Sequence, residues 1–182
     1  MKEKKVLLII DPQNGFKNKH TEKALKKIDE IVDFFDIKFV SIFHNPENSL
    51  YKNLLYWHNF AKHKNKEYSE LAIKADKKYK TLKTHKYGKI SWGFKTYIKL
   101  NKIKTIYICG VETDACVYKT ALDIFDLGVT PIIISDACGS CRSKKFHDMA
   151  LMLAERQIGE DQVLTFDEIK DKSEHKVVEI LM

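Results

Sequence analysis

Arginine is scarce in this chain of 182 residues, although basic residues are abundant. Only two of the 32 basic residues, Arg142 and Arg156, are arginine, and the net charge is +7. Nucleic-acid-binding proteins usually cluster their basic residues and use the arginine fork to contact bases and phosphates. Here the lysines are scattered among acidic residues. We therefore interpret them as a solvated surface and expect no nucleic-acid partner.

Long apolar runs are absent as well. No stretch of about 18 apolar residues occurs, so we expect no transmembrane helix and no membrane partner. The first apolar run, Val6–Ile10, leads directly into Asp11-Pro12 and is too short for the apolar core of a signal peptide. There is no internal repeat and no low-complexity linker. We predict a single domain over residues 1–182 and a cytoplasmic enzyme.

Cysteine is limited to four residues, which in a cytoplasmic chain are expected to stay reduced. Cys138 and Cys141 form a lone C-x-x-C, without the second pair of a structural zinc site and without a thioredoxin context. A redox protein built on this pair remains an alternative, and it would be indifferent to mutation of Cys116. Cys109 is expected in the core.

The most informative segment that is present runs from Ile106 to Asp123. An apolar strand ends at Gly110, a short loop follows, and Cys116 stands at the start of a helix-like segment. A helix N-terminus favours a thiolate, and ligands of open α/β sheets bind at the carboxyl ends of strands. The pattern is typical of a nucleophile. The alternative is a small buried hydrophobe at a joint between strand and helix.

Asp11 occupies a similar position in the N-terminal part of the chain. It follows the continuous apolar run Val6–Ile10, which is typical of a parallel strand buried on both faces. Asp11 is therefore expected at the same edge of the sheet as Cys116. Alternatively, it opens a turn before Pro12.

The rest of the chain alternates expected strands and helices. Strands are expected near 5–10, 38–43, 80–85, 105–109, 130–135 and 163–165, and helices near 21–35, 92–100, 116–127, 143–157 and at the C-terminus. This alternation predicts an α/β fold, a three-layer α/β/α sandwich around a central, mostly parallel sheet of about five to six strands. The aromatic segment 45–65 is expected to cover the mouth of a site.

Several motifs resemble those of the isochorismatase-like cysteine hydrolases, a superfamily that includes nicotinamidases. They are Asp11-Pro12-Gln13, Lys86 with Ser91–Phe94, the run Gly110-Val111-Glu112-Thr113-Asp114-Ala115-Cys116-Val117, Thr120-Ala121, Gly128, Asp136-Ala137 and His147. The resemblance covers roughly Val6 to Leu164. It implies an isochorismatase-like, Rossmann-like fold and hydrolysis of a small-molecule amide.

The resemblance also implies an Asp-Lys-Cys triad. Asp11 would be the base, Cys116 the nucleophile that forms a thioester, and a lysine the cation between them. Relatives place this lysine four residues before the serine of a Ser-Ala-Phe segment, but Tyr87 stands there in this chain. We favour Lys86, at the end of a strand, and keep Lys89 as the alternative.

The same resemblance implies the surroundings of the triad. A non-proline cis peptide maps onto Val111–Glu112, and the oxyanion would be held by backbone N–H groups of Glu112 and Cys116.

Substrate-binding candidates are Gln13, Phe16, Trp92 and Phe94. A homo-oligomer, either a dimer or a tetramer, is expected from the resemblance alone. His147 is expected to be structural.

A metal ion and other cofactors are not expected. Nicotinamidases of this group carry an Asp-x-His pair after the second strand, whereas this chain has Phe43-His44-Asn45. His44, His58 and His63 lack convincing ligand spacing and are interpreted as surface or lid residues. This argues against nicotinamide as the substrate. The alternatives are a nicotinamidase with atypical metal ligands and a catalytically silent member that binds a small ligand or a partner.

Overall fold

The computed structural model describes residues 4–60, 66–74 and 78–181. The strands are β1 (Val6–Ile10), β2 (Ile37–Phe43), β3 (Lys80–Thr84), β4 (Thr105–Val111), β5 (Thr130–Gly139) and β6 (Val163–Leu164). The helices are α1 (Glu22–Ile31), α2 (Leu50–Asn53), α3 (Lys66–Ser69), α4 (Trp92–Leu100), α5 (Tyr118–Asp126), α6 (Lys144–Ile158) and α7 (Phe166–Leu181). Strands and helices thus alternate along most of the chain.

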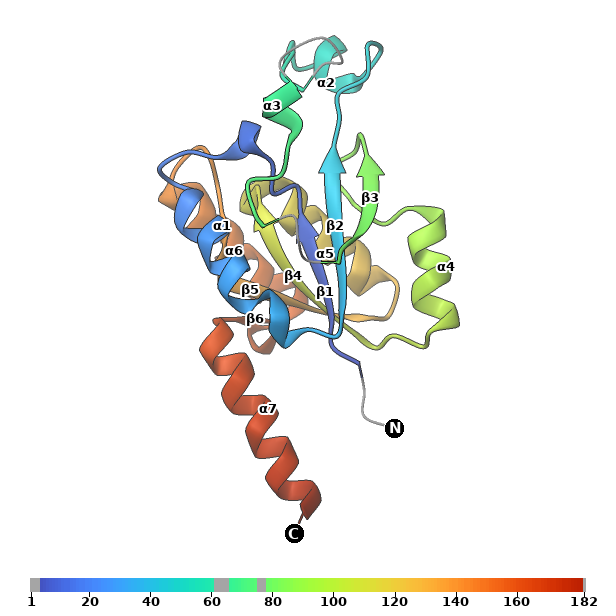
Figure 1. Cartoon of the computed structure of the whole chain (residues 1–182), viewed down its shortest axis with the longest axis vertical. Helices are drawn as coiled ribbons and strands as arrows, with labels where there is room; N and C mark the ends of the chain where they lie inside the picture. Colours follow the sequence, from blue (N-terminus) through green and yellow to red (C-terminus); the bar gives the residue numbers. More distant parts are fainter. Residues whose placement is uncertain (1–3, 61–65, 75–77, 182) are drawn as a thin grey trace.

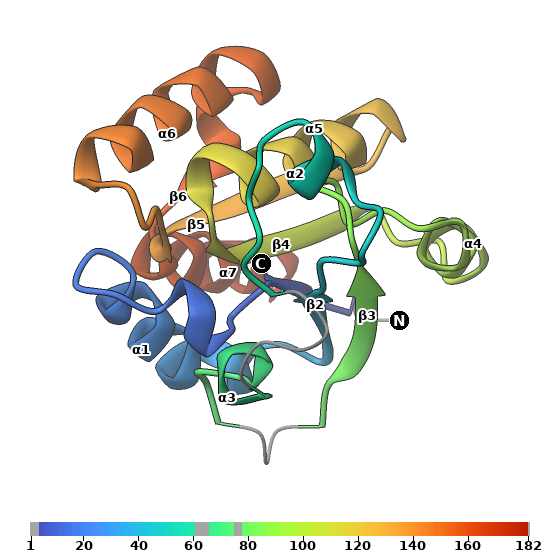
Figure 2. The same ribbon diagram turned by 90° about the horizontal axis from the view of Figure 1, so that it is seen from above.

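The six strands form one sheet in the order β3-β2-β1-β4-β5-β6, and every pair is parallel. Helix α1 covers one face, where the start of α7 lies beside it before α7 extends beyond the end of the sheet, and α4, α5 and α6 cover the other face (Figures 1 and 2). The predicted three-layer α/β/α sandwich is confirmed. Between β1 and β4 the strand order reverses, and open sheets of this kind bind ligands outside the carboxyl ends of strands at such a switch point.

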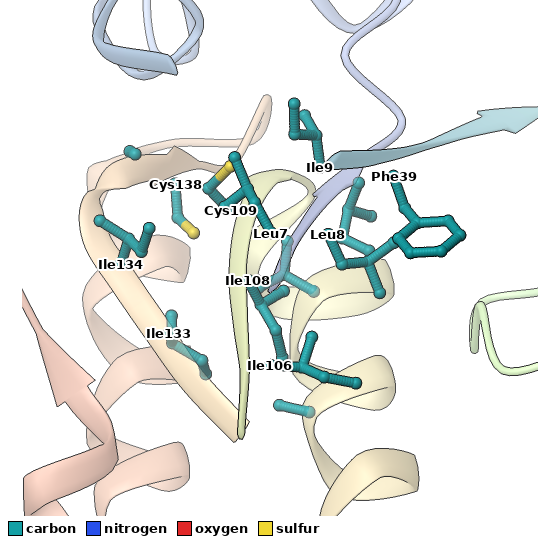
Figure 3. Packing of buried hydrophobic residues seen from close by; sticks show 14 of the residues in the cluster. Leu7, Leu8, Ile9, Phe39, Ile106, Ile108, Cys109, Ile133, Ile134 and Cys138 are labelled. Carbon is teal, nitrogen blue, oxygen red and sulfur yellow. The ribbon is translucent and has the colours of Figure 1, made fainter. Parts of the chain in front are cut away.

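The core lies on both faces of the central strands. All five residues of β1 are fully buried, as are Ile106 and Ile108 of β4 (Figure 3). Continuous burial explains why these strands are apolar throughout instead of alternating with polar residues. The central strands consequently form a rigid base from which the loops at their carboxyl ends project.

Four predicted boundaries differ clearly from the structure. Strands β4 and β5 are longer than expected, because they resume pairing after an irregularity, with Gly110 opposite Cys138 and Val111 opposite Gly139. The helix expected from Cys116 begins at Tyr118, and a π-helical turn, Thr113–Val117, precedes it. The helix expected over 21–35 ends at Ile31 and continues as a 3-10 turn.

No helix among the described residues is both long enough and apolar enough to cross a membrane. The short helices α2 and α3 lie beyond the carboxyl ends of the strands, on the side where the sheet edge carries Asp11 and the loop after β4 (Figure 1). Residues 61–65, part of the segment expected to cover the site, are outside the described residues.

Candidate active site

Asp11 and Cys116 meet because β1 and β4 are neighbours in the sheet. Ile10 pairs with Gly110, so Asp11 follows β1 directly beside the loop that carries Cys116. The two strands approach closely at Gly110, where a Cβ atom would lie 2.2 Å from the carbonyl oxygen of Ile10. Gly110 also has a φ of 119°, a conformation that favours glycine. The expected proximity of the acid and the thiol therefore follows from the pairing of two buried strands.

The Asp11 carboxylate is fully buried and is held by Ser41 at the middle of β2. The Asp11 N–H donates to Ser41 Oγ at 3.0 Å, and Ser41 Oγ donates to Asp11 Oδ1 at 2.6 Å. Asp11 has a φ of 43°, which is unusual for a residue other than glycine. Backbone strain at a buried carboxylate is typical of a functional position.

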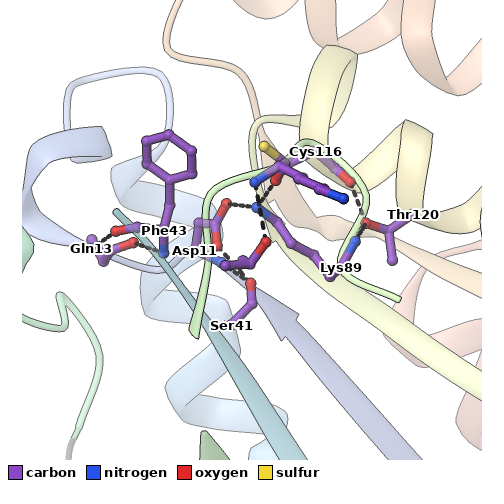
Figure 4. A network of polar contacts seen from close by, with 9 residues as sticks. Asp11, Gln13, Ser41, Phe43, Lys89, Cys116 and Thr120 are labelled. Carbon is purple, nitrogen blue, oxygen red and sulfur yellow. Dashed lines mark hydrogen bonds and ion pairs between the residues drawn. The ribbon is translucent and has the colours of Figure 1, made fainter. Parts of the chain in front are cut away.

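The cation beside Asp11 is Lys89, the alternative in the sequence analysis. Lys89 Nζ lies 2.6 Å from Asp11 Oδ2, and both side chains are completely buried. Lys89 Nζ also donates to the carbonyl of Lys86 at 2.8 Å. Figure 4 shows Asp11, Lys89 and Cys116 side by side at this edge of the sheet. A buried cation needs such partners, because an unpaired charge in the interior is strongly unfavourable.

The placement of the Lys86 side chain in this cluster was wrong. Lys86 is exposed and contributes only its backbone carbonyl. The reason is topological: β3 is the outermost strand, two places from β1, so a side chain near its end lies away from Asp11. The loop after β3 turns back toward α5 and carries Lys89 inward. It runs so close to α5 at Gly88 that a Cβ atom there would meet the Asp123 carboxylate at 2.0 Å.

Thr120 of α5 connects the lysine to the cysteine. The Lys89 N–H donates to Thr120 Oγ1 at 3.2 Å, and Thr120 Oγ1 donates to the Cys116 carbonyl at 2.6 Å (Figure 4). The Thr120 hydroxyl therefore holds the backbone of Lys89 and the backbone of Cys116 in place.

Burial raises the pKa of the Cys116 thiol, and the Asp11 charge raises it further, while Lys89 lowers it. Asp11 also accepts a hydrogen bond from the thiol, which favours the protonated form. Burial and the Asp11 charge thus oppose the stabilisation of a thiolate that was expected from a helix N-terminus, since both raise the pKa of the thiol. A π-helical turn surrounds Cys116, and the group that faces its proton is a carboxylate. The geometry is that of a thiol beside its base.

The Val111–Glu112 peptide bond is cis, as the resemblance implied. The Glu112 carbonyl accepts from the N–H groups of Ala115 and Val117 at 3.2 and 3.0 Å. The Glu112 side chain extends toward the loop after β5, where its Oε2 accepts from the Cys141 N–H at 2.6 Å. Burial raises the pKa of Glu112. Glu112 therefore ties the cysteine loop to the loop after β5.

His147 of α6 supports the same loop. Its Nδ1 lies 2.9 Å from Thr113 Oγ1, and burial lowers the pKa of the imidazole. This position agrees with the structural role that we expected from the sequence.

A cavity of about 360 Å³ opens directly over Cys116. One wall is aromatic and consists of Phe16, Phe43, Tyr51, Trp57 and Tyr87. The opposite wall comes from the cysteine loop and the loop after β5. This cavity, called the catalytic cavity below, has the size and the apolar lining of a small-molecule site.

One of the four predicted substrate-binding residues, Phe16, lines the catalytic cavity. Gln13 is fully buried and exchanges hydrogen bonds with the backbone of Phe43. It therefore holds the segment after β1 against the end of β2 and does not line the cavity. Trp92 is 84% exposed at the start of α4. Phe94 packs in the core against Phe39, with ring centroids 4.7 Å apart. Their proximity to Lys89 in sequence was misleading, because α4 covers the outer part of the sheet.

Residues Phe43, Tyr51, Trp57, Tyr87 and Cys141 line the cavity and were not predicted to bind substrate. The sequence signal for two of them, Tyr51 and Trp57, was the aromatic segment that was expected to cover the site. Cys141 had a different interpretation, as half of a lone C-x-x-C. Its thiol donates to the Phe16 carbonyl at 2.8 Å, whereas Cys138 is buried. Cys141 thus joins two walls of the cavity.

The histidines do not assemble into a metal centre among the residues that the structure describes. His44 lies beside His85, with ring centroids 5.6 Å apart, but no group of three potential ligands forms in that part of the chain. His63 lies outside the described residues. The histidines that the structure describes thus do not form the three-ligand zinc site of a hydrolase.

The isochorismatase domain family model matches residues 5–165. The rat isochorismatase domain-containing protein 2 is 33% identical over 85 residues, which cover 45% of this chain and 40% of the rat protein. A nicotinamidase of Acinetobacter baylyi is 44% identical over 48 residues, which cover 26% of this chain and 22% of that protein. The matched segments span less than half of either relative.

The fold agrees with these matches. The crystal structure of an isochorismatase-like hydrolase from Alkaliphilus metalliredigens superposes with a TM-score of 0.78 at 18% identity, covering 93% of this chain and 98% of that one. An acid, a lysine and a cysteine at the switch point of a parallel sheet define an α/β protein with a thiol-centred site. The chain belongs to the isochorismatase family.

Proposed function

We propose that this protein hydrolyses the C–N bond of a small-molecule amide through a thioester on Cys116. The observation that carries the proposal is the grouping of Asp11, Lys89 and Cys116 beneath one cavity, with Lys89 Nζ 2.6 Å from the Asp11 carboxylate. The partial match to a nicotinamidase supports amide chemistry as well.

The first half of the reaction forms the thioester. Asp11 takes the proton of the Cys116 thiol while the sulfur attacks the amide carbonyl, so the thiolate exists only as the bond forms. Lys89 lowers the pKa of the thiol and balances the negative charge that passes between sulfur and carboxylate. The oxyanion is held by the backbone N–H groups of Glu112 and Cys116. Asp11 then gives its proton to the nitrogen, the C–N bond breaks, and ammonia or an amine leaves.

The second half returns the enzyme to its resting state. Asp11 deprotonates a water molecule that attacks the thioester, the carboxylic acid leaves, and the sulfur recovers its proton. The sum is amide plus water to carboxylic acid plus amine. No step in this scheme uses a metal ion.

The test is a screen of small primary amides for ammonia release, with acid-quenched samples weighed by intact-protein mass spectrometry. The wild type should release ammonia and carry an acyl group on Cys116, and Cys116→Ala should do neither. Amide turnover that survives in Cys116→Ala, or that needs added zinc, would contradict the proposal and favour the metal-dependent alternative. A chain that binds amides without hydrolysing them would be the silent member.

We further propose a cytoplasmic homo-oligomer, dimer or tetramer, for this protein. Multi-angle light scattering and cell fractionation test these two properties separately.

A further inference from the structure

A second and larger cavity adjoins the catalytic cavity. Its volume is about 620 Å³, and it lies between the α2 segment and the loop after β3. Tyr51, Leu55 and Tyr87 line both cavities, so the two share a wall. The rings of Tyr51 and Tyr87 touch in an edge-to-face arrangement, with centroids 5.0 Å apart. We call this second space the distal cavity. It continues the path that leads outward from Cys116.

The floor of the distal cavity is apolar and open to solvent. Leu50 and Leu54 of the α2 segment are 70% and 69% exposed, and Leu55 is 58% exposed. A single exposed leucine is ordinary, but three that line one concave space form a surface that a ligand can remove from water. Each methylene of a ligand buried there contributes about 0.8 kcal/mol of transfer free energy. The lining therefore favours an aliphatic or aromatic chain.

The rim of the distal cavity is basic. His85 and Lys86 line it together, and none of the lining residues in the described part of the chain is acidic. Among the described residues, no carboxylate forms an ion pair with Lys86, and the nearby Glu47 is already paired with Lys52 at 2.8 Å. The Lys86 backbone carbonyl, however, accepts from Lys89 Nζ. An anion at the Lys86 side chain would lie in the distal cavity, which joins the catalytic cavity over Cys116 at Tyr51, Leu55 and Tyr87.

We propose that the distal cavity is a substrate subsite, and that the substrate is a primary amide with an apolar chain ending in a carboxylate. The amide carbonyl lies over Cys116, the chain passes Tyr51 and Tyr87 and covers the exposed leucines, and the carboxylate meets Lys86. This inference rests on the proposed amide hydrolysis. It gives Lys86 a role in recognition instead of catalysis.

The experiment compares matched substrates. The monoamides of adipic and suberic acid are assayed against hexanamide and octanamide by ammonia release, which separates the terminal charge from the chain length. The variants are Lys86→Met and Lys86→Glu, and the control is Lys83→Met, an exposed lysine of β3 that does not line the cavity. Leu54→Ser tests the apolar floor at an exposed position.

The wild type should have a lower KM for the monoamides than for the neutral amides of the same chain length. Lys86→Met should raise the KM of the monoamides by about fivefold, the upper range for an exposed charge pair, with kcat unchanged because the contact is remote from the reacting bond. Lys86→Glu should reverse the preference. Leu54→Ser should raise the KM of suberic monoamide and of octanamide more than the KM of the shorter adipic monoamide and hexanamide.

Two results would overturn the inference while leaving amide hydrolysis in place. One is a preference for the carboxylate that survives in Lys86→Met or falls equally in Lys83→Met. The other is self-association that Leu54→Ser abolishes without any change in KM, which would make the exposed leucines an interface between copies of the chain. Absence of Cys116-dependent turnover with every amide would overturn the proposed function and this inference together.

Discussion

The two walls of the catalytic cavity are built in different ways. In the polar wall, Cys116 lines the cavity, and the fully buried Asp11 and Lys89 lie behind it. Ser41 of β2 holds Asp11, and Thr120 of α5 bonds to Lys89 and to the Cys116 carbonyl. The aromatic wall comes largely from the end of β2 and the segment after it, where Tyr51 and Trp57 pack on Phe43 with ring centroids 5.1 and 5.8 Å from that of Phe43.

We infer from this difference that the polar wall carries out the reaction and the aromatic wall selects the substrate. A buried, paired charge cluster has one stable arrangement, because removing any partner leaves an uncompensated group. Aromatic contacts tolerate exchange of one ring for another of similar volume. We therefore expect substitutions in the polar wall to change kcat or stability, and substitutions in the aromatic wall to change KM.

The largest effect is expected for the base. Asp11→Asn removes the group that takes the thiol proton, so kcat should fall by about 10²- to 10⁴-fold, the usual contribution of general acid-base catalysis. Ammonia release under saturating amide measures this loss. Asp126→Asn, at an exposed aspartate of α5, is the matched control and should keep full activity. Equal activity of the two variants would remove Asp11 from the mechanism.

Lys89 and Lys86 give the sharpest contrast in stability. Lys89→Met leaves the buried Asp11 carboxylate without its cation, which should lower the free energy of unfolding by about 3–5 kcal/mol. Lys86→Met changes an exposed side chain and should stay within about 0.5 kcal/mol. Urea denaturation followed by circular dichroism measures both. Comparable stability of the two variants would contradict the pairing of Lys89 with Asp11.

These two lysines also show where prediction from sequence reached its limit. Asp11 and Cys116 could be placed because each follows an apolar strand, and parallel strands bring their carboxyl ends to one edge. Which lysine joins them depends on the path of the loop after β3. That path is set by contacts with α5, namely the bond of Lys89 to Thr120 and the close approach at Gly88. The spacing of Lys86 and Lys89 from Ser91 in the sequence does not reflect these contacts.

Thiol reactivity should change in opposite directions within the polar wall. Asp11 raises the pKa of Cys116 and Lys89 lowers it. At a given pH, Asp11→Asn should therefore be alkylated faster than the wild type, and Lys89→Met more slowly, although both lose turnover. Iodoacetamide labelling of Cys116 across pH, read by peptide mass spectrometry in a Cys141→Ser background, measures the shift. A change of the same sign in both variants would be inconsistent with this arrangement of charges.

The aromatic wall should respond through binding. Trp57→Ala removes one ring of the wall and should raise KM by about three- to tenfold, since an aromatic pair contributes roughly 0.5–1.5 kcal/mol, while kcat stays nearly constant. Trp92→Ala removes an exposed ring outside the cavity and serves as the control. Steady-state kinetics with one amide is sufficient. A fall in kcat without a change in KM would contradict the assignment of substrate binding to the aromatic wall.

The individual residues of this wall could not be read from the sequence. The aromatic content of the segment after β2 predicted a cover, but which rings face inward depends on tertiary contacts. Phe16 and Phe60 stack with centroids 4.5 Å apart, whereas Tyr56 is left 79% exposed. Trp92 and Phe94 were placed near the substrate because they follow the lysine loop. In the fold, α4 leads them away from the cavity.

The smallest expected effect concerns Glu112, which lines the catalytic cavity and ties the cysteine loop to the loop after β5. Burial raises its pKa in the folded protein above the ordinary value of 4.5. The folded state therefore binds this proton more tightly than the unfolded state, so this group lowers the stability of the wild type as pH rises from about 4.5 through the raised pKa. Glu112→Gln does not titrate. Its free energy of unfolding, relative to the wild type, should accordingly increase across that interval and level off above it.

Urea denaturation at several pH values measures this difference, with Glu30→Gln, at an exposed glutamate of α1, as the control. A difference that stays flat with pH for Glu112→Gln would mean that the bond from the Cys141 N–H outweighs the cost of burial and keeps the carboxylate ionised. In that case Glu112 belongs to the polar wall, as a third fixed charge beside Asp11 and Lys89. A difference in the free energy of unfolding that rises with pH would instead mean that Glu112 links the cysteine loop to the loop after β5 as an uncharged group. The charges of the site would then be those of Asp11 and Lys89.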